Sequence, residues 1–322
     1  MKSKSVTKVL AGLFTSLSLC AAASVSAQTV SVSSIVEHPA LDSIRDGVKH
    51  SLEQAGYTEA KGLKWQFQTA QGNTAIATQI ARKFVGDNSD VIVAISTPSA
   101  QAVLAASKSV PIVYSAVTDP VAAQLVSSFE ASGTNVTGVS DALALEKQLE
   151  LIKKIVPDAK NVGMVYNPGE ANSAVVVERM KALLSAEDMS LVEATAARTV
   201  DVGAAARSLV GKVDVIYTNT DNNVVSAYES LVKVVNDANI PLIASDTDSV
   251  GRGAIAALGV NYYDLGLQTG EIVVRILKGE KPGDIASQTS NKLELFVNPG
   301  AAEKQGVELD PEFLQSATKI VE

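Results

Sequence analysis

Residues 90–120 read DVIVAISTPSAQAVLAASKSVPIVYSAVTDP, and this stretch decides the fold class of the 322-residue chain. It starts with the apolar run 91–95, continues into a helix opened by Thr97 and Pro98, and ends in a second apolar run, 110–114. Thr is a favourable N-cap and Pro a favourable first helical residue. Continuous apolar runs joined by crossover helices are typical of a parallel sheet covered on both faces. The stretch therefore predicts an α/β fold.

The same alternation extends in both directions from this stretch. Before it, strands are predicted at residues 29–36 and 63–69, and each is followed by apolar residues at helical spacing. After it, the chain repeats the pattern, with predicted strands at residues 161–166, 191–194, 213–217 and 241–244. Helical patterns separate these strands as well. The order of elements predicts two α/β units in succession.

A short internal sequence repeat supports two similar units. The tripeptide DVI occurs at 90–92 and again at 214–216, and VPI at 110–112 is matched by IPL at 240–242. The offsets are 214 − 90 = 124 and 240 − 110 = 130, so the two pairs of tripeptides occur in the same order and at nearly the same spacing. This pattern favours duplicated lobes over one extended sheet. Chance similarity among α/β segments is the alternative.

Composition excludes several classes of protein. Hydrophobic residues make up 46% and charged residues 19%, as in a folded protein, and the length fits about two domains. The formal charge of −8 gives no general attraction to phosphate backbones, so we expect no nucleic-acid partner. One Cys and two His cannot build a structural zinc site, an iron–sulfur cluster or a disulfide framework. We therefore expect no metal and no cofactor.

Residues 1–27 have the features of a secretory signal peptide. Lys2, Lys4 and Lys8 precede the uncharged apolar run 9–23, and Val25-Ser26-Ala27 supplies small residues before a cleavage point. The alternative is a membrane anchor, but the apolar run is shorter than the roughly 20 residues that span a bilayer. The sequence predicts cleavage after Ala27 and a periplasmic product.

Unusually polar turns follow the predicted strands. In open α/β sheets, ligands bind outside the carboxyl ends of the strands, where helix N-termini present free N–H groups. Each turn could be a plain helix cap, but runs 167–173 and 218–222 carry more hydrogen-bonding side chains than a cap needs. We therefore predict a small polar ligand held between two lobes. The candidate ligand-binding residues are Glu37, His38, Ser96, Thr97, Ser115, Asp119, Asn167, Glu170, Asn172, Ser173, Thr220, Asp221 and Asp246.

Five motifs together resemble a known family. They are IVEHPALD (35–42), STPSAQA (96–102), AVTDPV (116–121), YNPGEANS (166–173) and LGLQTG (265–270). The chain, from about Val30 to its end, resembles substrate-binding proteins of ABC importers of the tryptophan/tyrosine transport type, which have the type I periplasmic-binding-protein fold. The resemblance implies two Rossmann-like lobes with parallel sheets, joined by three crossovers near residues 137–141, 251–258 and 290–295. Lobe one would comprise residues 28–140 plus 253–290, and lobe two residues 141–252 plus 291–322.

The resemblance also implies a function. The protein would capture a small amino-acid-like ligand, an L-aromatic amino acid, and deliver it as a monomer to ABC permease subunits. Neutral donors at a helix N-terminus suit the ligand carboxylate, and Ser96, Thr97 and Ser115 are the candidates. An acceptor-only carboxylate suits the ammonium group, and the open alternatives are Glu37, Asp119, Glu170, Asp221 and Asp246. Asn167, Asn172 and Ser173 would close over the ligand, while His38 is either a turn residue or a contact.

Other classes of function fit less well. An exported hydrolase would need a G-x-S-x-G elbow or a Ser, His and acid set, and neither stands out, so we expect no enzyme. A sugar-responsive repressor shares the fold but needs a DNA-binding headpiece. The remaining alternative is a periplasmic sensory binding protein that delivers its ligand to a receptor. Adjacent permease and ATPase genes would favour import, whereas an adjacent sensor gene would favour signalling.

Overall fold

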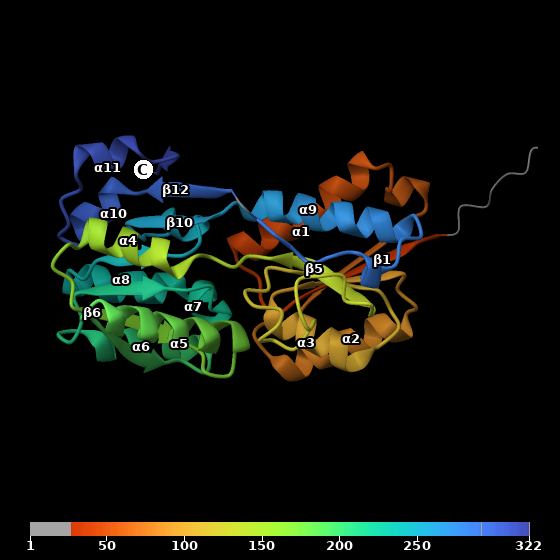
Figure 1. The fold of residues 1–322 in the computed structure, drawn as a ribbon, viewed down its shortest axis with the longest axis horizontal. Coiled ribbons are helices and arrows are strands. Elements are labelled where there is room, and N and C mark those ends of the chain that lie inside the picture. Colours follow the sequence, from red (N-terminus) through yellow and green to blue (C-terminus); the bar gives the residue numbers. More distant parts are fainter. Residues whose placement is uncertain (1–26, 291, 322) are drawn as a thin grey trace, which may run out of the picture.

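Two lobes lie side by side along the long axis of the molecule (Figure 1). The computed structural model describes residues 27–290 and 292–321, and each lobe is built on one sheet, of six and seven strands. The predicted signal peptide lies outside the described residues except for Ala27. In the ranges that are described, no helix combines the length and apolar character needed to cross a bilayer. The α/β class predicted from the sequence is confirmed.

The first sheet is parallel throughout. Its strands, in spatial order, are β11 (Gln288–Thr289), β5 (Val136–Ser140), β4 (Ile112–Ser115), β3 (Val91–Ile95), β1 (Thr29–Ser34) and β2 (Lys64–Thr69). Helices α1 (Pro39–Gln54) and α9 (Tyr262–Leu277) lie on one side, and α2 (Thr74–Gly86) and α3 (Thr97–Ala106) lie on the other (Figure 1). Every residue of β3 is buried, which explains its continuous apolar run.

The second sheet repeats this design with one reversed strand. Its strands, in spatial order, are β13 (Lys319–Ile320), β12 (Leu293–Val297), β10 (Ala256–Val260), β9 (Leu242–Ala244), β8 (Val215–Thr218), β6 (Asn161–Tyr166) and β7 (Ser190–Thr195). Strands β10 and β12 are antiparallel, and the other pairs are parallel. Two separate hydrophobic cores cover its two faces.

The helices of the second lobe divide between these two cores. One core contains side chains of α4 (Leu145–Ile155), α5 (Ala171–Ala186), α10 (Pro299–Lys304) and α11 (Pro311–Gln315). The other contains side chains of α6 (Val202–Leu209), α7 (Asn222–Ser226) and α8 (Tyr228–Ala238). Four 3₁₀ turns complete the described elements: η1 (Glu59–Lys61), η2 (Thr199–Asp201), η3 (Asp248–Val250) and η4 (Pro282–Asp284).

The chain passes between the sheets three times: from β5 to α4, from β10 to α9, and from β11 to β12. The first crossover follows residue 140, since the expected crossover 137–141 is mostly strand β5 of the first sheet. Residues 253–260 were expected in lobe one, and here the expectation was wrong. Strand β10 pairs with β9 and β12, because its buried Ala and Val side chains extend the second sheet. The second passage therefore falls at Asn261.

Helix α9 returns to the first sheet and packs very closely against α1. At the crossing, a methyl group added to Gly266 would clash with the backbone of Ile44, and one added to Gly47 would lie 2.9 Å from the Cα of Gly266. Only glycine allows two helix backbones to approach this closely. This contact joins segments more than 200 residues apart and carries the ends of β1 and β10 to the same region between the lobes.

Candidate functional site

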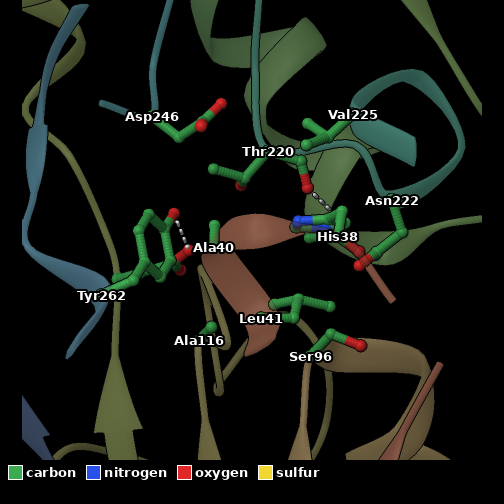
Figure 2. A pocket seen from close by; sticks show the side chains of 12 residues that line it. His38, Ala40, Leu41, Ser96, Ala116, Thr220, Asn222, Val225, Asp246 and Tyr262 are labelled. Atoms are coloured by element: carbon green, nitrogen blue, oxygen red, sulfur yellow. Dashed lines mark hydrogen bonds between the residues drawn. The ribbon is translucent and has the colours of Figure 1, made fainter. Parts of the chain in front are cut away.

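A cavity of about 330 Å³ lies between the lobes at the carboxyl ends of the strands (Figure 2). The first lobe lines it with residues that follow β1, β3 and β4: His38, Ala40, Leu41, Ser96 and Ala116. The second lobe contributes Asn172, Thr220, Asn222, Val225 and Asp246, and the crossovers contribute Asp141 and Tyr262. The sequence-predicted position between two lobes agrees with this cavity.

The N-terminus of α3 supplies neutral donors at one side of the cavity. The first hydrogen bond that spans four residues here runs from Ala100 N to Ser96 O, at 3.1 Å. The hydroxyls of Ser96, Thr97 and Ser99 are buried and have no hydrogen-bond partner among the described residues. Ser96 itself has φ 77° and ψ 158°, a conformation that L-residues rarely adopt. Free hydroxyls and N–H groups at a helix N-terminus form a site suited to a carboxylate.

Two buried carboxylates lie on the other side. Asp246 is 2% exposed and accepts hydrogen bonds from the N–H and the hydroxyl of Ser249, at 2.8 and 2.7 Å. Asp141 is 3% exposed and accepts from the hydroxyls of Thr118 and Tyr262, at 3.1 and 3.0 Å. Burial raises the pKa of both, and the charge of Asp246 raises the pKa of Asp141 further.

Little positive charge balances the carboxylates of Asp141 and Asp246. Arg252 acts on Asp246 from a distance, but its guanidinium forms an ion pair with Glu229, with Arg252 Nε 2.7 Å from Glu229 Oε1. His38 also lines the cavity, and burial, assisted by Arg252, lowers its pKa to about 3, so its ring is neutral. Buried carboxylates without a cation are costly, and a bound ammonium group would supply the missing charge.

Two amide side chains, held by one carboxyl group behind them, form part of the second-lobe wall. Asn172 and Asn222 line the cavity, and both donate side-chain hydrogen bonds to Glu170, at 3.2 and 2.5 Å. Asn172 also donates to the carbonyl of Thr220, at 3.1 Å. Burial, and secondarily the charge of Asp221, raises the pKa of Glu170 to about 7. Glu170 therefore holds the two amides in place from behind and does not itself line the cavity.

The carboxylate of Asp221 accepts all its hydrogen bonds from donors of the protein itself. It accepts from the N–H groups of Asn223 and Val224, both at 3.0 Å, and so caps α7. It also accepts from the N–H of Asn167 and the hydroxyl of Ser173, both at 2.6 Å. With four donors on one carboxylate, no position is left for a ligand ammonium group. Asp221, Asn167 and Ser173 support the wall and do not line the cavity.

Three first-lobe candidates also lie away from the cavity. Glu37 is exposed, and the Ser115 hydroxyl lies 2.8 Å from the hydroxyl of Thr269 on α9, so neither side chain faces a ligand. Asp119 accepts from the N–H groups of Val121 and Ala122 and pairs with Arg179 of the opposite lobe, 2.5 Å away. Asp119 therefore connects the lobes instead of binding in the cavity.

Seven of the twelve lining residues are not among the candidates from the sequence: Ala40, Leu41, Ala116, Asp141, Asn222, Val225 and Tyr262. Asp141 directly follows β5, at a position where the sequence predicts a crossover and not the end of a strand. Tyr262 follows Asn261, which caps α9 by accepting from the N–H of Asp264 at 3.1 Å. The polar residue after an apolar strand was a readable signal for Asp141. Tyr262 has no comparable signal, because only the return of α9 to the first lobe brings it to the cavity.

Comparison with solved structures defines the class of protein. An ABC transporter solute-binding protein from Bacillus halodurans with bound myo-inositol is 15% identical, with a TM-score of 0.61 over 87% of this chain and 98% of that one. A glucose-galactose binding protein from Geobacillus stearothermophilus gives a TM-score of 0.62 at 14% identity, over 84% of this chain and 98% of that one. The fold is that of the type I periplasmic binding proteins.

Sequence comparison then gives the family. The family described as ABC transporter substrate binding protein matches residues 29–321, so the chain belongs to that family. A tyrosine-binding protein of Clostridioides difficile is 42% identical over 84% of this chain and 79% of its own length. A conserved domain protein from Vibrio cholerae is 47% identical, with a TM-score of 0.90 over 92% of this chain and all of that one.

Two further relatives bear on the state of the cleft. A domain from Streptococcus pneumonia in complex with L-Trp is 30% identical, with a TM-score of 0.88 over 92% of this chain and all of that one. A ligand-free, open structure of a Clostridium difficile substrate binding protein is 40% identical, yet its TM-score is only 0.68, over 92% of this chain and 99% of that one. The lobes here are arranged more like those of the L-Trp complex than like those of the ligand-free, open structure.

Proposed function

We propose that this protein is exported, captures an L-aromatic amino acid between its lobes and delivers it to the permease of an ABC importer. The observation that carries the proposal is the polarity of the cavity: Ser96 and the α3 N-terminus lie on one side and the buried carboxylate of Asp246 on the other (Figure 2). A zwitterion has complementary groups for both sides.

The chemistry of each side suits one end of an amino acid. The ligand carboxylate would accept from the hydroxyl of Ser96, which lines the cavity, and from the N–H groups of Thr97 and Ser99 in the first turn of α3, none of which brings a counter-charge. The ammonium group would donate to Asp141 and Asp246, where the charge-assisted hydrogen bonds lie in a buried, low-dielectric site. The neutral ring of His38 leaves this charge balance unchanged.

An aromatic side chain is favoured by the relatives. The Clostridioides difficile relative is named for tyrosine binding, and the Streptococcus pneumonia structure contains L-Trp. Ligand contacts from both lobes would favour the closed arrangement and shift the population toward it. Closure would then be the signal that the permease reads. The family match supports delivery to an importer, and the N-terminal segment supports export.

A thermal-shift panel of the twenty L-amino acids tests the binding proposal. We expect L-Tyr or L-Trp to raise the unfolding temperature, since a ligand at about 1,000 times its Kd stabilises by about 4 kcal/mol. Clear stabilisation by a different compound, with no response to any aromatic amino acid, would overturn the assignment. Uptake of the labelled ligand should also fall in cells that lack this protein, and normal uptake would argue against a role in import.

A further inference from the structure

A second cavity, of about 420 Å³, adjoins the first between the lobes. The two cavities share Asp141 and Thr220 in their walls, so they lie next to each other. Five residues in the wall of the second cavity are apolar or aromatic: Ala142, Leu143, Leu145, Val176 and Tyr217. The second cavity therefore places apolar side chains directly beside the residues that suit an ammonium group.

Two buried polar side chains in this wall lack partners. Asn219 follows β8 and is 2% exposed, yet neither its amide oxygen nor its amide nitrogen has a hydrogen-bond partner in the part of the chain that the structure describes. Ser245 follows β9 and is 3% exposed; its hydroxyl lies close to that of Tyr217 but makes no hydrogen bond of normal geometry to any described residue. Buried amides and hydroxyls are almost always hydrogen-bonded, because leaving them unpaired is costly. Both residues line the cavity, so a ligand can reach them.

The charges around these side chains narrow the choice of ligand group. Arg179 lines the same cavity, but its charge is paired with Asp119. Tyr217 is a neutral phenol, because burial raises its pKa well above the usual range. Asn219 and Ser245 are themselves neutral, and each can both donate and accept. The matching group is a neutral polar atom carried on a large apolar body.

We propose that the second cavity holds the side chain of the bound amino acid and that Asn219, assisted by Ser245, hydrogen-bonds a polar atom on its ring. A phenol hydroxyl or an indole N–H meets this requirement, and a plain phenyl ring does not. When phenylalanine is bound, the Asn219 amide stays buried and unpaired, which penalises that ligand. The protein therefore prefers tyrosine or tryptophan over phenylalanine. This inference rests on the proposed function, since it assigns the side-chain end of the same ligand.

Calorimetric titration of L-Tyr, L-Trp and L-Phe tests the proposal on the wild-type protein and on Asn219→Leu. We expect the wild type to bind L-Tyr or L-Trp at least about tenfold more tightly than L-Phe. Leucine has nearly the shape of asparagine but no polar atom. In Asn219→Leu the affinity for the preferred ligand should fall while that for L-Phe is kept, so the preference shrinks to about threefold or less. The matched control Val176→Ala, in the same wall, should weaken all three ligands by similar factors.

The outcomes separate this proposal from the one on which it rests. If the wild type binds none of the three amino acids, the proposed function fails. If it binds all three within about threefold of one another, binding of aromatic amino acids stands and the role of Asn219 is overturned. Equal losses for all three ligands in Asn219→Leu would also overturn it. Ser245→Ala, a smaller change, gives a second variant should Asn219→Leu fail to fold.

Discussion

Asp246→Asn replaces one oxygen of a cavity carboxylate by an amide nitrogen of the same size. Asn can still accept from the N–H of Ser249 through its oxygen, and the Ser249 hydroxyl can turn to accept from the new NH₂ group. Because burial raises the pKa of Asp246, its charge destabilises the empty protein, and removing it should leave the free energy of unfolding unchanged or higher. Only ligand binding should suffer.

The size of the loss follows from the burial of Asp246. At 2% exposure the carboxylate is shielded from water, so its hydrogen bond to an ammonium group is worth about 1.5–3 kcal/mol. Since 1.4 kcal/mol corresponds to a factor of ten, affinity for the amino acid should fall roughly 10- to 100-fold.

The assay compares the amino acid with its analogue that lacks the amino group, by calorimetry on the wild type and on Asp246→Asn. The analogue brings no ammonium group, so its affinity should be unchanged or improved in the variant. Equal affinity of both proteins for the amino acid would refute the assignment of Asp246. A similar loss for both ligands would show a change of cavity shape in place of a lost charge pair. Asp141→Asn, measured in parallel, tests the other carboxylate.

Four further changes test other parts of the structure. Ser96→Gly should raise the free energy of unfolding by about 1 kcal/mol in urea titrations, because glycine tolerates a φ of 77°, and it should weaken binding by removing a hydroxyl. The empty protein should lose on the order of 2 kcal/mol of stability as pH rises from 4.5 to about 7, because over this range native Glu170 binds a proton that the unfolded chain releases. Glu170→Gln should flatten that part of the profile, and an unchanged profile would contradict the assignment. Arg179→Ala should weaken ligand affinity by no more than about fivefold, and less at high salt, because its 59% exposure makes the ion pair with Asp119 a weak link between the lobes. Gly266→Ala should lower the free energy of unfolding by about 1–3 kcal/mol, since its methyl group would force α1 and α9 apart, and wild-type thermal stability would disprove that tight crossing.

Much of the fold could be predicted from the sequence. Strands β3 and β6 have the predicted bounds, because apolar runs buried on both faces are readable without tertiary information. Strand β10 was misplaced, because a short run of Ala and Val carries no sign of which sheet it joins. The helical pattern between the predicted strands 213–217 and 241–244 is in fact two helices, α7 and α8, that meet at Ala227.

The candidate site was predicted less completely. His38, Ser96, Asn172, Thr220 and Asp246 line the cavity, because residues that follow parallel strands meet at one edge of a sheet. Glu170 and Asp221 instead hold neighbouring loops. A carboxylate after a strand can point toward the cleft or accept hydrogen bonds from neighbouring loops and helix N-termini. The donors that fix its direction come from residues some 50 positions away. Such long-range contacts leave no local pattern in the sequence.

The crossing of α1 and α9 has a consequence for how the chain is made. Helix α1 ends at residue 54, but its close neighbour α9 begins only at residue 262, and strand β11 of the same sheet at residue 288. The first lobe cannot be completed until nearly all of the polypeptide has left the ribosome. If the protein is exported as proposed, such a delay would keep the chain unfolded for longer, which is the state in which a secretion channel accepts its cargo.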